Sequence, residues 1–456
     1  MGLPASLSLA VISLLLTANS VISSLNTTHE SFMQCFLDHS RPSNSSSKLL
    51  YSPNTTTYDA VLRSSIQNNR FLYSSSTTKP VLIVTPTNES HVQAAVVCSR
   101  KHGLRVRVRS GGHDYEGMSY VSEGDRFIIV DLAALRSVTV DTGQSTAWVQ
   151  AGATLGEVYY TIAEKNRTVG FSAGTCPTVG VGGHFSGGGI GTLSRKYGTA
   201  ADNIVDARLV DVNGRILDRQ SMGEDYFWAI RGGGAASFGI VLSYKIELNY
   251  VPPIVTAFNV IKTLKQDATK LVTKWEQIGP NLDENLYIRV MAQVMDDDEA
   301  EGNRTIQAVF NSLYLGTCYS GRPTEVLLDR RPEFNISFKA KSDFVREPVT
   351  ETAWEEIWRF LMEAKDEPVT LIMEPFGGVL DEIAESATPF PHRKGNLYII
   401  QYIMAWFETD TETTERHLSW MRKLYALMTP LGYVKSKVDP HNFFRNEQSI
   451  QPIKPL

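Results

Sequence analysis

The feature that most limits how this chain can fold is the stretch GTCPTVGVGGHFSGGGIG, which runs from Gly174 to Gly191 and contains eight glycines and one cysteine. Because glycine has no Cβ, its backbone reaches positive φ without strain and can lie close against a flat or phosphorylated group. Neither common phosphate motif applies, since G-x-x-x-x-G-K-[ST] is absent and Phe185, Thr192 or Ser194 replaces the third glycine of G-x-G-x-x-G. The stretch therefore predicts close backbone contact with a ligand that neither motif describes.

Length and composition are those of a globular protein with more than one domain. The 456 residues exceed what one ordinary hydrophobic core contains. Hydrophobic residues make up 42% of the chain and charged residues 20%. The formal net charge of −5 gives no electrostatic basis for binding nucleic acid, so no such partner is expected.

Residues 1–24 have the pattern of a secretory signal peptide, with a short apolar run that ends in small residues. That run is shorter than the roughly 20 residues that span a bilayer, so no membrane span is expected after signal removal. Several N-x-[ST] sequons favour a glycosylated, secreted protein. They lie at Asn26, Asn44, Asn54, Asn88, Asn166, Asn303 and Asn335.

The four cysteines differ in their surroundings. Cys35 and Cys98 lie in apolar, helix-like segments and are plausible disulfide partners in an oxidising compartment. Cys176 is unusual because it lies among glycines and directly before a proline. Cys318 has no clear role.

Residues 80–250 alternate between strand and helix patterns, with strands often joined by hairpins, which predicts an α+β domain that is not doubly wound. Thr154 and Glu157 form a capping box at the start of one helix, and Gly103 ends another. The Asn-Gly pair within residues 203–218 predicts a hairpin. Strands are expected at 80–86, 105–110, 126–132, 147–153 and 238–248, and helices at 92–103, 154–165 and 225–232.

A second domain is expected after the VPP sequence at 251–253, which is a natural boundary. Long strand patterns at 286–295 and 396–407 are followed by a helix pattern at 411–428. This arrangement predicts a sheet backed by helices.

Two glycine turns hold the side chains with the most reactive chemistry. RSGGHDYEG contains His113, and the glycine-rich stretch contains Cys176, and both residue types can form covalent bonds. Three other interpretations remain open at this point. These are a metal site of His113, Cys176, His184 and perhaps Asp114, a disulfide between Cys176 and Cys318, and a Cys–His hydrolase.

Several segments together resemble the plant berberine bridge enzyme-like family, which belongs to the flavoproteins with the vanillyl-alcohol oxidase fold. They are RSGGHDYEG, the glycine-rich stretch with YGTAADNIVDA after it, FWAIRGGG, and the tail DPHNFFRNEQSI. The chain is also similar to cannabinoid acid synthases, which are members. The resemblance implies a PCMH-type FAD-binding domain of two subdomains at 25–250 and a substrate domain with an antiparallel, helix-backed sheet at 251–430. It also implies a C-terminal segment, 431–456, that returns to the FAD domain.

The resemblance implies that FAD is attached through two bonds, from His113 to the flavin 8α-methyl and from Cys176 to flavin C6. The glycines would let the backbone lie along the ring and the pyrophosphate. Val179 matches a position where a small residue gives oxygen access to the reduced flavin. The other residues implied at the cofactor are Arg109, Ser110, Gly111, Gly112, Gly180, Gly182, Gly183 and His184.

The implied activity is the oxidation of an alcohol or C–H bond by hydride transfer, with O2 as acceptor and H2O2 as product. Carbohydrates, monolignols and specialised metabolites are the substrate classes implied. The enzyme is expected to be a monomer. Tyr115 and Gln401 match substrate-side positions of members that oxidise monolignols, whereas Ile399 stands where those members have a lysine.

The chain departs from the family at the segment that carries the catalytic tyrosine, N-Y-R-D-L-D-L-G. That segment is missing between the helix at 411–428 and the tail, and Tyr433 belongs to the tail rather than to the lost motif. A second shortening lies near Cys318. The alternative function is therefore a flavin-binding protein without turnover.

Overall fold

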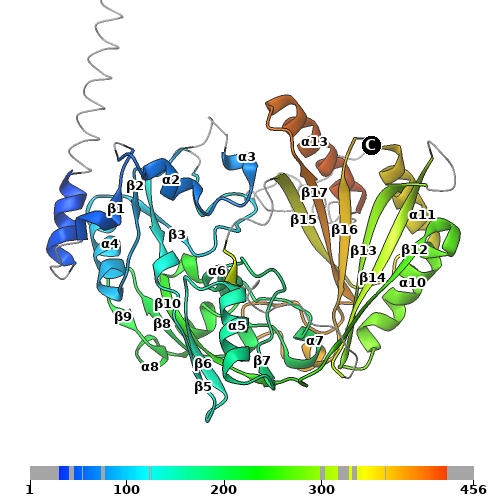
Figure 1. Ribbon diagram of the computed structural model, residues 1–456, viewed down its shortest axis with the longest axis horizontal. Coiled ribbons are helices and arrows are strands. Elements are labelled where there is room, and N and C mark those ends of the chain that lie inside the picture. Colours follow the sequence, from blue (N-terminus) through cyan, green and yellow to red (C-terminus); the bar gives the residue numbers. More distant parts are fainter. Residues whose placement is uncertain are drawn as a thin grey trace, which may run out of the picture.

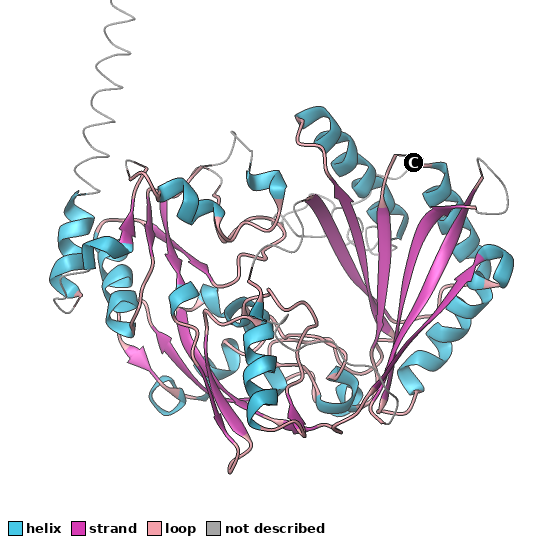
Figure 2. Ribbon diagram, viewed as in Figure 1, coloured by secondary structure: helices cyan, strands magenta, loops and turns pink. Residues whose placement is uncertain are grey.

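The computed structural model of this chain describes residues 30–40, 46–53, 55–72, 78–122, 124, 126–297, 303–316, 328–330, 336–364 and 366–428. These residues form two lobes, one with two main sheets and the other with a single large sheet (Figures 1 and 2). The predicted α+β class is confirmed. The predictions about Cys318, Tyr433 and residues 431–456 fall outside the described residues.

The first lobe contains a four-stranded sheet in the order β1-β2-β4-β3, in which β2, β4 and β3 are parallel. Its central strand is buried on both faces, as expected for apolar parallel strands. One face packs on α4 (Glu89–Lys101) and the other on α2 (Tyr58–Arg63). The strands are β1 (Leu50–Tyr51), β2 (Leu82–Val84), β3 (Arg105–Arg109) and β4 (Phe127–Asp131).

The second sheet of this lobe is antiparallel, with five strands in the order β5-β6-β10-β8-β9. The predicted Asn-Gly hairpin joins β8 to β9, with Gly214 at φ 77°. The predicted capping box of Thr154 and Glu157 begins α5 (Leu155–Lys165). The strands are β5 (Val138–Asp141), β6 (Thr146–Gln150), β8 (Ile204–Val210), β9 (Ile216–Leu217) and β10 (Ile240–Glu247).

Shorter elements complete the first lobe. A two-stranded sheet pairs β7 with β11. These elements are β7 (Val169–Gly170), β11 (Asn249–Tyr250), α3 (Asn69–Leu72), α6 (Val181–Ser186), α7 (Ser194–Tyr197), α8 (Arg219–Met222) and α9 (Glu224–Ala229).

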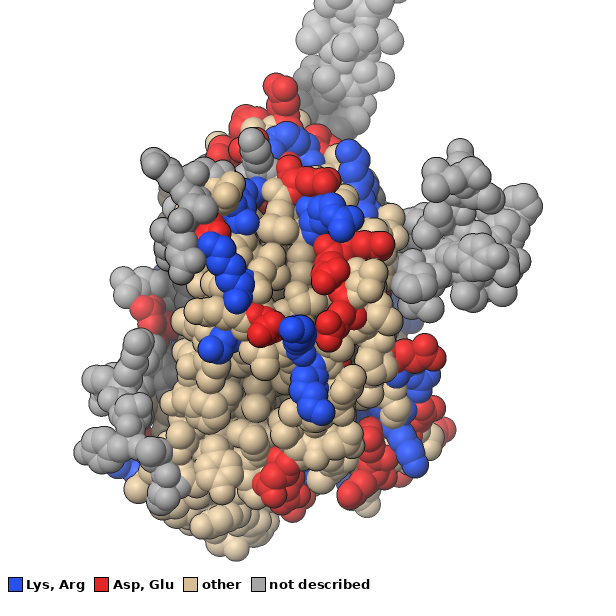
Figure 3. Space-filling view, turned by 90° about the vertical axis from the view of Figure 1, so that its right-hand side faces the viewer, with Lys and Arg blue, Asp and Glu red and all other residues tan. Residues whose placement is uncertain are grey.

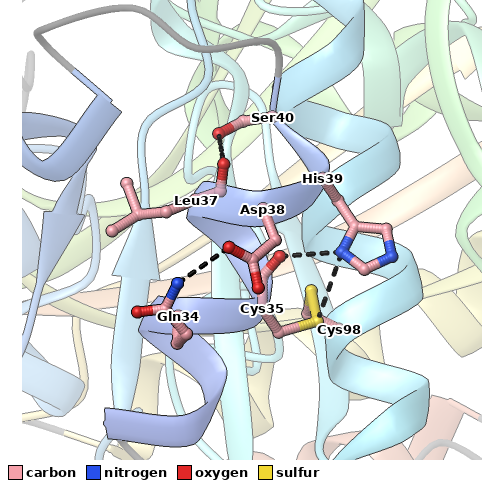
Figure 4. The surroundings of a disulfide bond; sticks show 7 residues. All are labelled: Gln34, Cys35, Leu37, Asp38, His39, Ser40 and Cys98. Carbon is pink, nitrogen blue, oxygen red and sulfur yellow. Dashed lines mark hydrogen bonds between the residues drawn. A yellow bond between two sulfur atoms is a disulfide. The ribbon is translucent and has the colours of Figure 1, made fainter.

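A disulfide between Cys35 and Cys98 fastens the helical residues 30–39 to α4 (Figure 4). Both cysteines are buried. The His39 ring lies beside the bridge, with Nδ1 at 2.8 Å from the Cys35 carbonyl oxygen. The proposed partners from the sequence are therefore bonded.

The second lobe is a six-stranded antiparallel sheet in the order β12-β14-β13-β16-β17-β15. Alternate residues of β17 are buried, from Tyr398 to Trp406, and face α10, α11 and α13, while the other residues face the first lobe (Figure 1). The strands are β12 (Thr256–Thr263), β13 (Leu286–Asp296), β14 (Arg304–Tyr314), β15 (Ser337–Val345), β16 (Val369–Pro375) and β17 (Tyr398–Trp406). The helices are α10 (Ala268–Ile278), α11 (Glu351–Glu363), α12 (Val379–Glu382) and α13 (Thr411–Met428).

Two buried arginines hold the lobes together. Arg195, at the start of α7, donates hydrogen bonds to five backbone carbonyls of the second lobe. Arg393 forms a bidentate ion pair with Asp202, with contacts of 2.7 and 2.9 Å. Both arginine side chains are nearly inaccessible to solvent, so these bonds are shielded from competition with water.

The surface carries charges of both signs. On the face that Figure 3 shows, acidic and basic side chains are interspersed and neither sign forms a large patch. In the part of the chain that the structure describes, no helix is both long and apolar enough to cross a membrane.

Candidate active site

The two predicted glycine turns touch each other through their backbones. A Cβ built on Gly111 would lie 2.3 Å from the amide nitrogen of Gly180, and one built on Gly180 would lie 2.2 Å from that of Gly111. Real Cβ atoms do not approach other atoms so closely, so only glycine fits at these two positions. Ser110 also joins the turns, since its hydroxyl accepts a hydrogen bond from the Gly182 amide at 3.3 Å.

The turns enclose a cavity of about 320 Å³. A third wall comes from small residues near β10, Ala235, Ala236 and Gly239. Most of the residues predicted at the cofactor line this cavity. They are Ser110, Gly111, Gly112, His113, Val179, Gly180, Gly182, Gly183 and His184.

Cys176 and Arg109 are the predicted cofactor residues that do not line this cavity. The Arg109 side chain lies elsewhere. Its guanidinium is fully buried and forms an ion pair with Asp131 at 2.6 Å. It also donates to the carbonyl oxygens of Val61 and Leu62, both at 2.7 Å. The side chain therefore holds the turn against α2, and only the backbone of Arg109 is available to a bound cofactor.

His113 and Cys176 meet at one hydroxyl group. Nε2 of His113 lies 2.8 Å from Oγ1 of Thr178, and Sγ of Cys176 lies 3.5 Å from the same oxygen. The two residues are 63 positions apart in the sequence, and the contact between the glycine turns brings them together. Thr178 was not among the residues predicted, although it stands two residues after the cysteine.

Burial keeps both histidines of the cavity neutral. Loss of solvation lowers the pKa of His113 to about 4. It also lowers the pKa of His184 to about 4, and repulsion from His113 contributes. The His184 Nε2 accepts a hydrogen bond from the Gly174 amide at 2.8 Å.

The metal interpretation lacks geometric support within the described ranges. Among the described residues, the ligand atoms of His113, Cys176 and His184 do not all lie within 4.8 Å of one another. In addition, Nε2 of His184 accepts the hydrogen bond from the Gly174 amide. The one described group compact enough for an ion is Cys35, His39 and Cys98, whose two sulfurs are bonded to each other.

A second cavity, of about 400 Å³, lies between the lobes and adjoins the first at Asp114, which lines both. Tyr115 and Gln401 line this cavity together and share a hydrogen bond. The pKa of Tyr115 is raised above its ordinary value, because the effect of partial burial outweighs the opposing effect of the bond to Gln401. The remaining lining residues are Glu116, Met118, Ala340, Lys341, Ser342 and Tyr425.

The inner face of the large sheet carries a carboxylate near this second cavity. Glu374 lies opposite Ile399 in the register of β16 and β17, on the same face as Gln401. Its side chain is 24% exposed and lies 3.8 Å from the Arg289 guanidinium. Burial raises the pKa of Glu374, while Arg289 lowers it. Sequence reasoning missed this residue because β16 was not predicted.

Comparison with known proteins assigns the chain to a family. Residues 80–219 match the family described as FAD binding domain, and residues 430–451 match the one described as berberine and berberine like. The chain is 42% identical to berberine bridge enzyme-like 18 of Arabidopsis thaliana over 520 aligned positions that cover 96% of each chain. This chain belongs to the berberine bridge enzyme-like family. It is therefore an FAD-linked oxidoreductase.

Other proteins similar to this chain include an enzyme and two pollen allergens. Tetrahydroberberine oxidase of Berberis wilsoniae is 43% identical over 516 positions, covering 95% of this chain and 96% of that one. The Bermuda grass isoallergen BG60 matches with a TM-score of 0.80 and 40% identity, covering 92% of this chain and all of that one. Phl p 4, a grass pollen allergen with glucose dehydrogenase activity, matches with a TM-score of 0.80 and 37% identity, covering 93% of this chain and 100% of that one. A variant of Phl p 4 with valine in place of one isoleucine is described as a glucose oxidase.

The first cavity of this family member fits FAD. Its walls are mainly backbone and small side chains, so a flat ring system meets few Cβ atoms. A Cβ added to Gly183 would meet no other atom within 4 Å, which leaves room on that wall. The backbone of both glycine turns and the side chains of His113, Thr178 and Cys176 would hold the cofactor, which supplies the redox chemistry when bound.

Proposed function

We propose that this chain is a secreted oxidase whose FAD is attached to both His113 and Cys176. It oxidises an alcohol or a C–H bond of a carbohydrate, a monolignol or a specialised metabolite by hydride transfer, with O2 as acceptor and H2O2 as product. The observation that carries the proposal is that the His113 imidazole and the Cys176 sulfur both lie within 3.5 Å of the Thr178 hydroxyl oxygen. His113 lines the cavity that fits FAD, and the Cys176 sulfur lies near the same hydroxyl as its imidazole, which suits attachment at adjacent positions of one ring.

Each attachment is an oxidation. In net terms, one C–H bond of the flavin and one N–H or S–H bond of the protein are exchanged for a C–N or C–S bond. The two protons and two electrons released would be accepted by O2, which becomes H2O2. Because burial lowers the pKa of His113 to about 4, its imidazole is neutral and nucleophilic at pH 7.

Val179 supports O2 as the electron acceptor. It lines the first cavity, at the position that resembles the family's gate to the reduced flavin. In Phl p 4, the glucose dehydrogenase and the glucose oxidase differ by an isoleucine-to-valine exchange. Valine at position 179 is therefore consistent with an oxidase.

The second cavity is the proposed substrate site. Its position between residues of the FAD-binding region and the large sheet agrees with a flavin domain over 25–250 and a substrate domain over 251–430. Hydroxyl, amide and charged groups line it, including Tyr115, Gln401 and Lys341, and these groups suit a substrate with several oxygen atoms. Tyr115 and Gln401 would orient such a substrate by hydrogen bonds.

The disulfide supports the proposed secretion, because disulfides persist in oxidising compartments. Among the described sequons, Asn88 and Asn303 are exposed and accessible to glycosylation. We propose the apoplast, the cell wall or the vacuole as the location.

A flavin-binding protein without turnover is the second candidate, and the lengths of the aligned chains favour it. The alignment with the Arabidopsis relative spans 520 positions, more than the 456 residues of this chain, so the relative has internal segments that this chain lacks. The family's catalytic tyrosine belongs to one missing segment. Loss of a general base typically lowers the rate about 10²–10⁴-fold.

Two measurements test these candidates. Mass spectrometry of a tryptic digest is expected to show one flavin joined to the peptides of His113 and Cys176, whereas release of free FAD on acid precipitation would contradict the double attachment. Anaerobic mixing with glucose, coniferyl alcohol and tetrahydroberberine then separates oxidase from binding protein. Bleaching of the flavin by one of them supports the oxidase, and an unchanged spectrum with all three supports the second candidate.

A further inference from the structure

We propose that Thr178 is a positioning residue for both covalent links, with its hydroxyl accepting a hydrogen bond from His113 and donating one to Cys176, because its Oγ1 lies 2.8 Å from Nε2 of His113 and 3.5 Å from Sγ of Cys176. This inference rests on the double attachment proposed above. It assigns to one side chain the preparation of both nucleophiles.

The geometry allows one hydroxyl to serve both neighbours. A threonine hydroxyl has one hydrogen to donate and two lone pairs that accept. Its oxygen lies 2.8 Å from Nε2 of His113 and 3.5 Å from Sγ of Cys176, both within hydrogen-bond range for these elements. Neither neighbour needs to move for the two bonds to exist together.

Acceptance of a hydrogen bond from Nε2 selects one tautomer of His113. When Nε2 carries the proton, the lone pair lies on Nδ1, which becomes the nucleophilic nitrogen. The ring is neutral because burial lowers the pKa of His113 to about 4, so the tautomer decides which nitrogen reacts. The new C–N bond then forms at Nδ1. The Nε2 proton and one methyl hydrogen leave, and two electrons pass through the ring to O2.

Donation of the hydroxyl hydrogen favours the reactive form of Cys176. A hydrogen bond to sulfur stabilises the thiolate, which is the form of cysteine that attacks carbon. The same hydroxyl orientation therefore serves His113 and Cys176 at once, whereas the opposite orientation, with Thr178 donating to His113, leaves no hydrogen for the sulfur.

The backbone holds the Thr178 side chain in place. Thr178 is only 3% exposed. The carbonyls on either side of it, of Pro177 and Val179, accept hydrogen bonds from the amides of Gly156 and Leu155, each at 2.9 Å. These amides belong to the first turn of α5, so the loop is fixed to a helix. A side chain fixed in this way suits the alignment of two reacting atoms.

The test compares the full-length proteins carrying Thr178→Val, Thr178→Ser and Thr175→Val with the unchanged chain. Valine matches threonine in shape but lacks the hydroxyl, serine restores the hydroxyl, and Thr175 is an exposed residue of the same loop. Mass spectrometry at intervals after expression measures the fraction of chains with flavin on each peptide. Thr178→Val is expected to slow the formation of both links by about tenfold or more, while the other two variants form them at the rate of the unchanged chain.

The outcomes separate the two proposals. If the unchanged chain carries a single link or none, the proposed attachment is wrong, and this inference falls with it. If the unchanged chain has both links and Thr178→Val forms them at the same rate, only the role of Thr178 is overturned. Nuclear magnetic resonance of the flavin peptide from the unchanged chain gives a second measurement that needs no folded variant, because substitution at Nε2 instead of Nδ1 also overturns that role.

Discussion

Gly111 and Gly180 lie in direct backbone contact, with each Cα facing the amide nitrogen of the other residue. This contact joins the turn that carries His113 to the turn that carries Cys176. Thr178 belongs to the same turn as Cys176, so the contact between the turns is what brings His113 to Thr178. The relation of the two glycines therefore determines whether both proposed links can form on one flavin.

Substitution at this contact is expected to separate the turns. In Gly180→Ala the added methyl would lie 2.2 Å from the Gly111 nitrogen, and overpacking of this kind typically costs about 1–3 kcal/mol of unfolding free energy. The unfolding free energy measured in urea and the fraction of flavin bound through both residues are expected to fall together. Gly187→Ala is the matched control, because its methyl would approach other atoms no closer than 3.5 Å. Full double attachment in Gly180→Ala would contradict the role of the contact.

Arg195 is expected to make a large contribution to stability through its contacts between the two lobes. Arg195→Met removes donors from five carbonyls, including those of Leu282 and Leu286 at 2.6 and 2.7 Å. Buried carbonyls without partners are costly, so a loss of at least about 3 kcal/mol in unfolding free energy is expected. Denaturant titration measures it, with Arg136→Met as control because the Arg136 side chain is 53% exposed. Equal unfolding midpoints for the two variants would show that the hydrogen bonds of Arg195 contribute little to stability.

Glu276 is expected to make stability fall with rising pH. This buried carboxylate accepts hydrogen bonds from Tyr398 and Trp354, and burial raises its pKa from 4.5 to about 7. Between these values the folded protein holds a proton that the unfolded chain releases, so the unfolding free energy falls as pH rises through this window. The stabilisation is complete below pH 4.5 and lost above pH 7.

The Glu276 effect is measured by urea unfolding at pH 5 and pH 8. Glu276→Gln stays neutral and is expected to remove a loss on the order of 2–3 kcal/mol across this range. The exposed Glu355→Gln on α11 is expected to keep the pH dependence of the unchanged chain. An identical pH dependence in Glu276→Gln would show that another group is responsible.

Attachment through His113 is expected to persist in acid. In Cys176→Ala, the rate at which apoprotein acquires histidyl-linked FAD should stay constant from pH 8 to pH 5. Protonation removes the lone pair, so the rate should reach half its maximum near pH 4, where the pKa of His113 lies. The flavin absorbance of acid-precipitated protein measures the rate. A midpoint near 6.5, the ordinary histidine pKa, would show that the ring is solvated before attachment.

Local patterns in the sequence predicted the local structure well. The strand pattern at 396–407, the capping box at Thr154 and the Asn-Gly hairpin each depend on neighbouring residues, and all three are confirmed. The disulfide partners were also recognised, since both cysteines lie in apolar helical segments.

Contacts between distant segments could not be predicted from the sequence. The place of β15 at the edge of the large sheet, beside β17, depends on strand pairing that no local pattern specifies. Tyr115 meets Gln401 only because the lobes pack together. The strand expected at 105–110 is present as β3, but nothing in its local sequence indicated that Arg109 would be fully buried in an ion pair with Asp131. Thr178 has no sequence signal of its own, because a single hydroxyl among glycines is not a motif.

The buried Arg195 and Arg393 limit the ways in which substrate specificity can change within such a fold. Separation of the lobes would break the bonds of Arg195 and the Arg393–Asp202 pair simultaneously, so an opening motion between the lobes is costly. A change of substrate specificity would then have to arise through substitution of individual side chains that line the second cavity, such as Tyr115, Ser342 and Gln401, while the distance between the lobes stays the same.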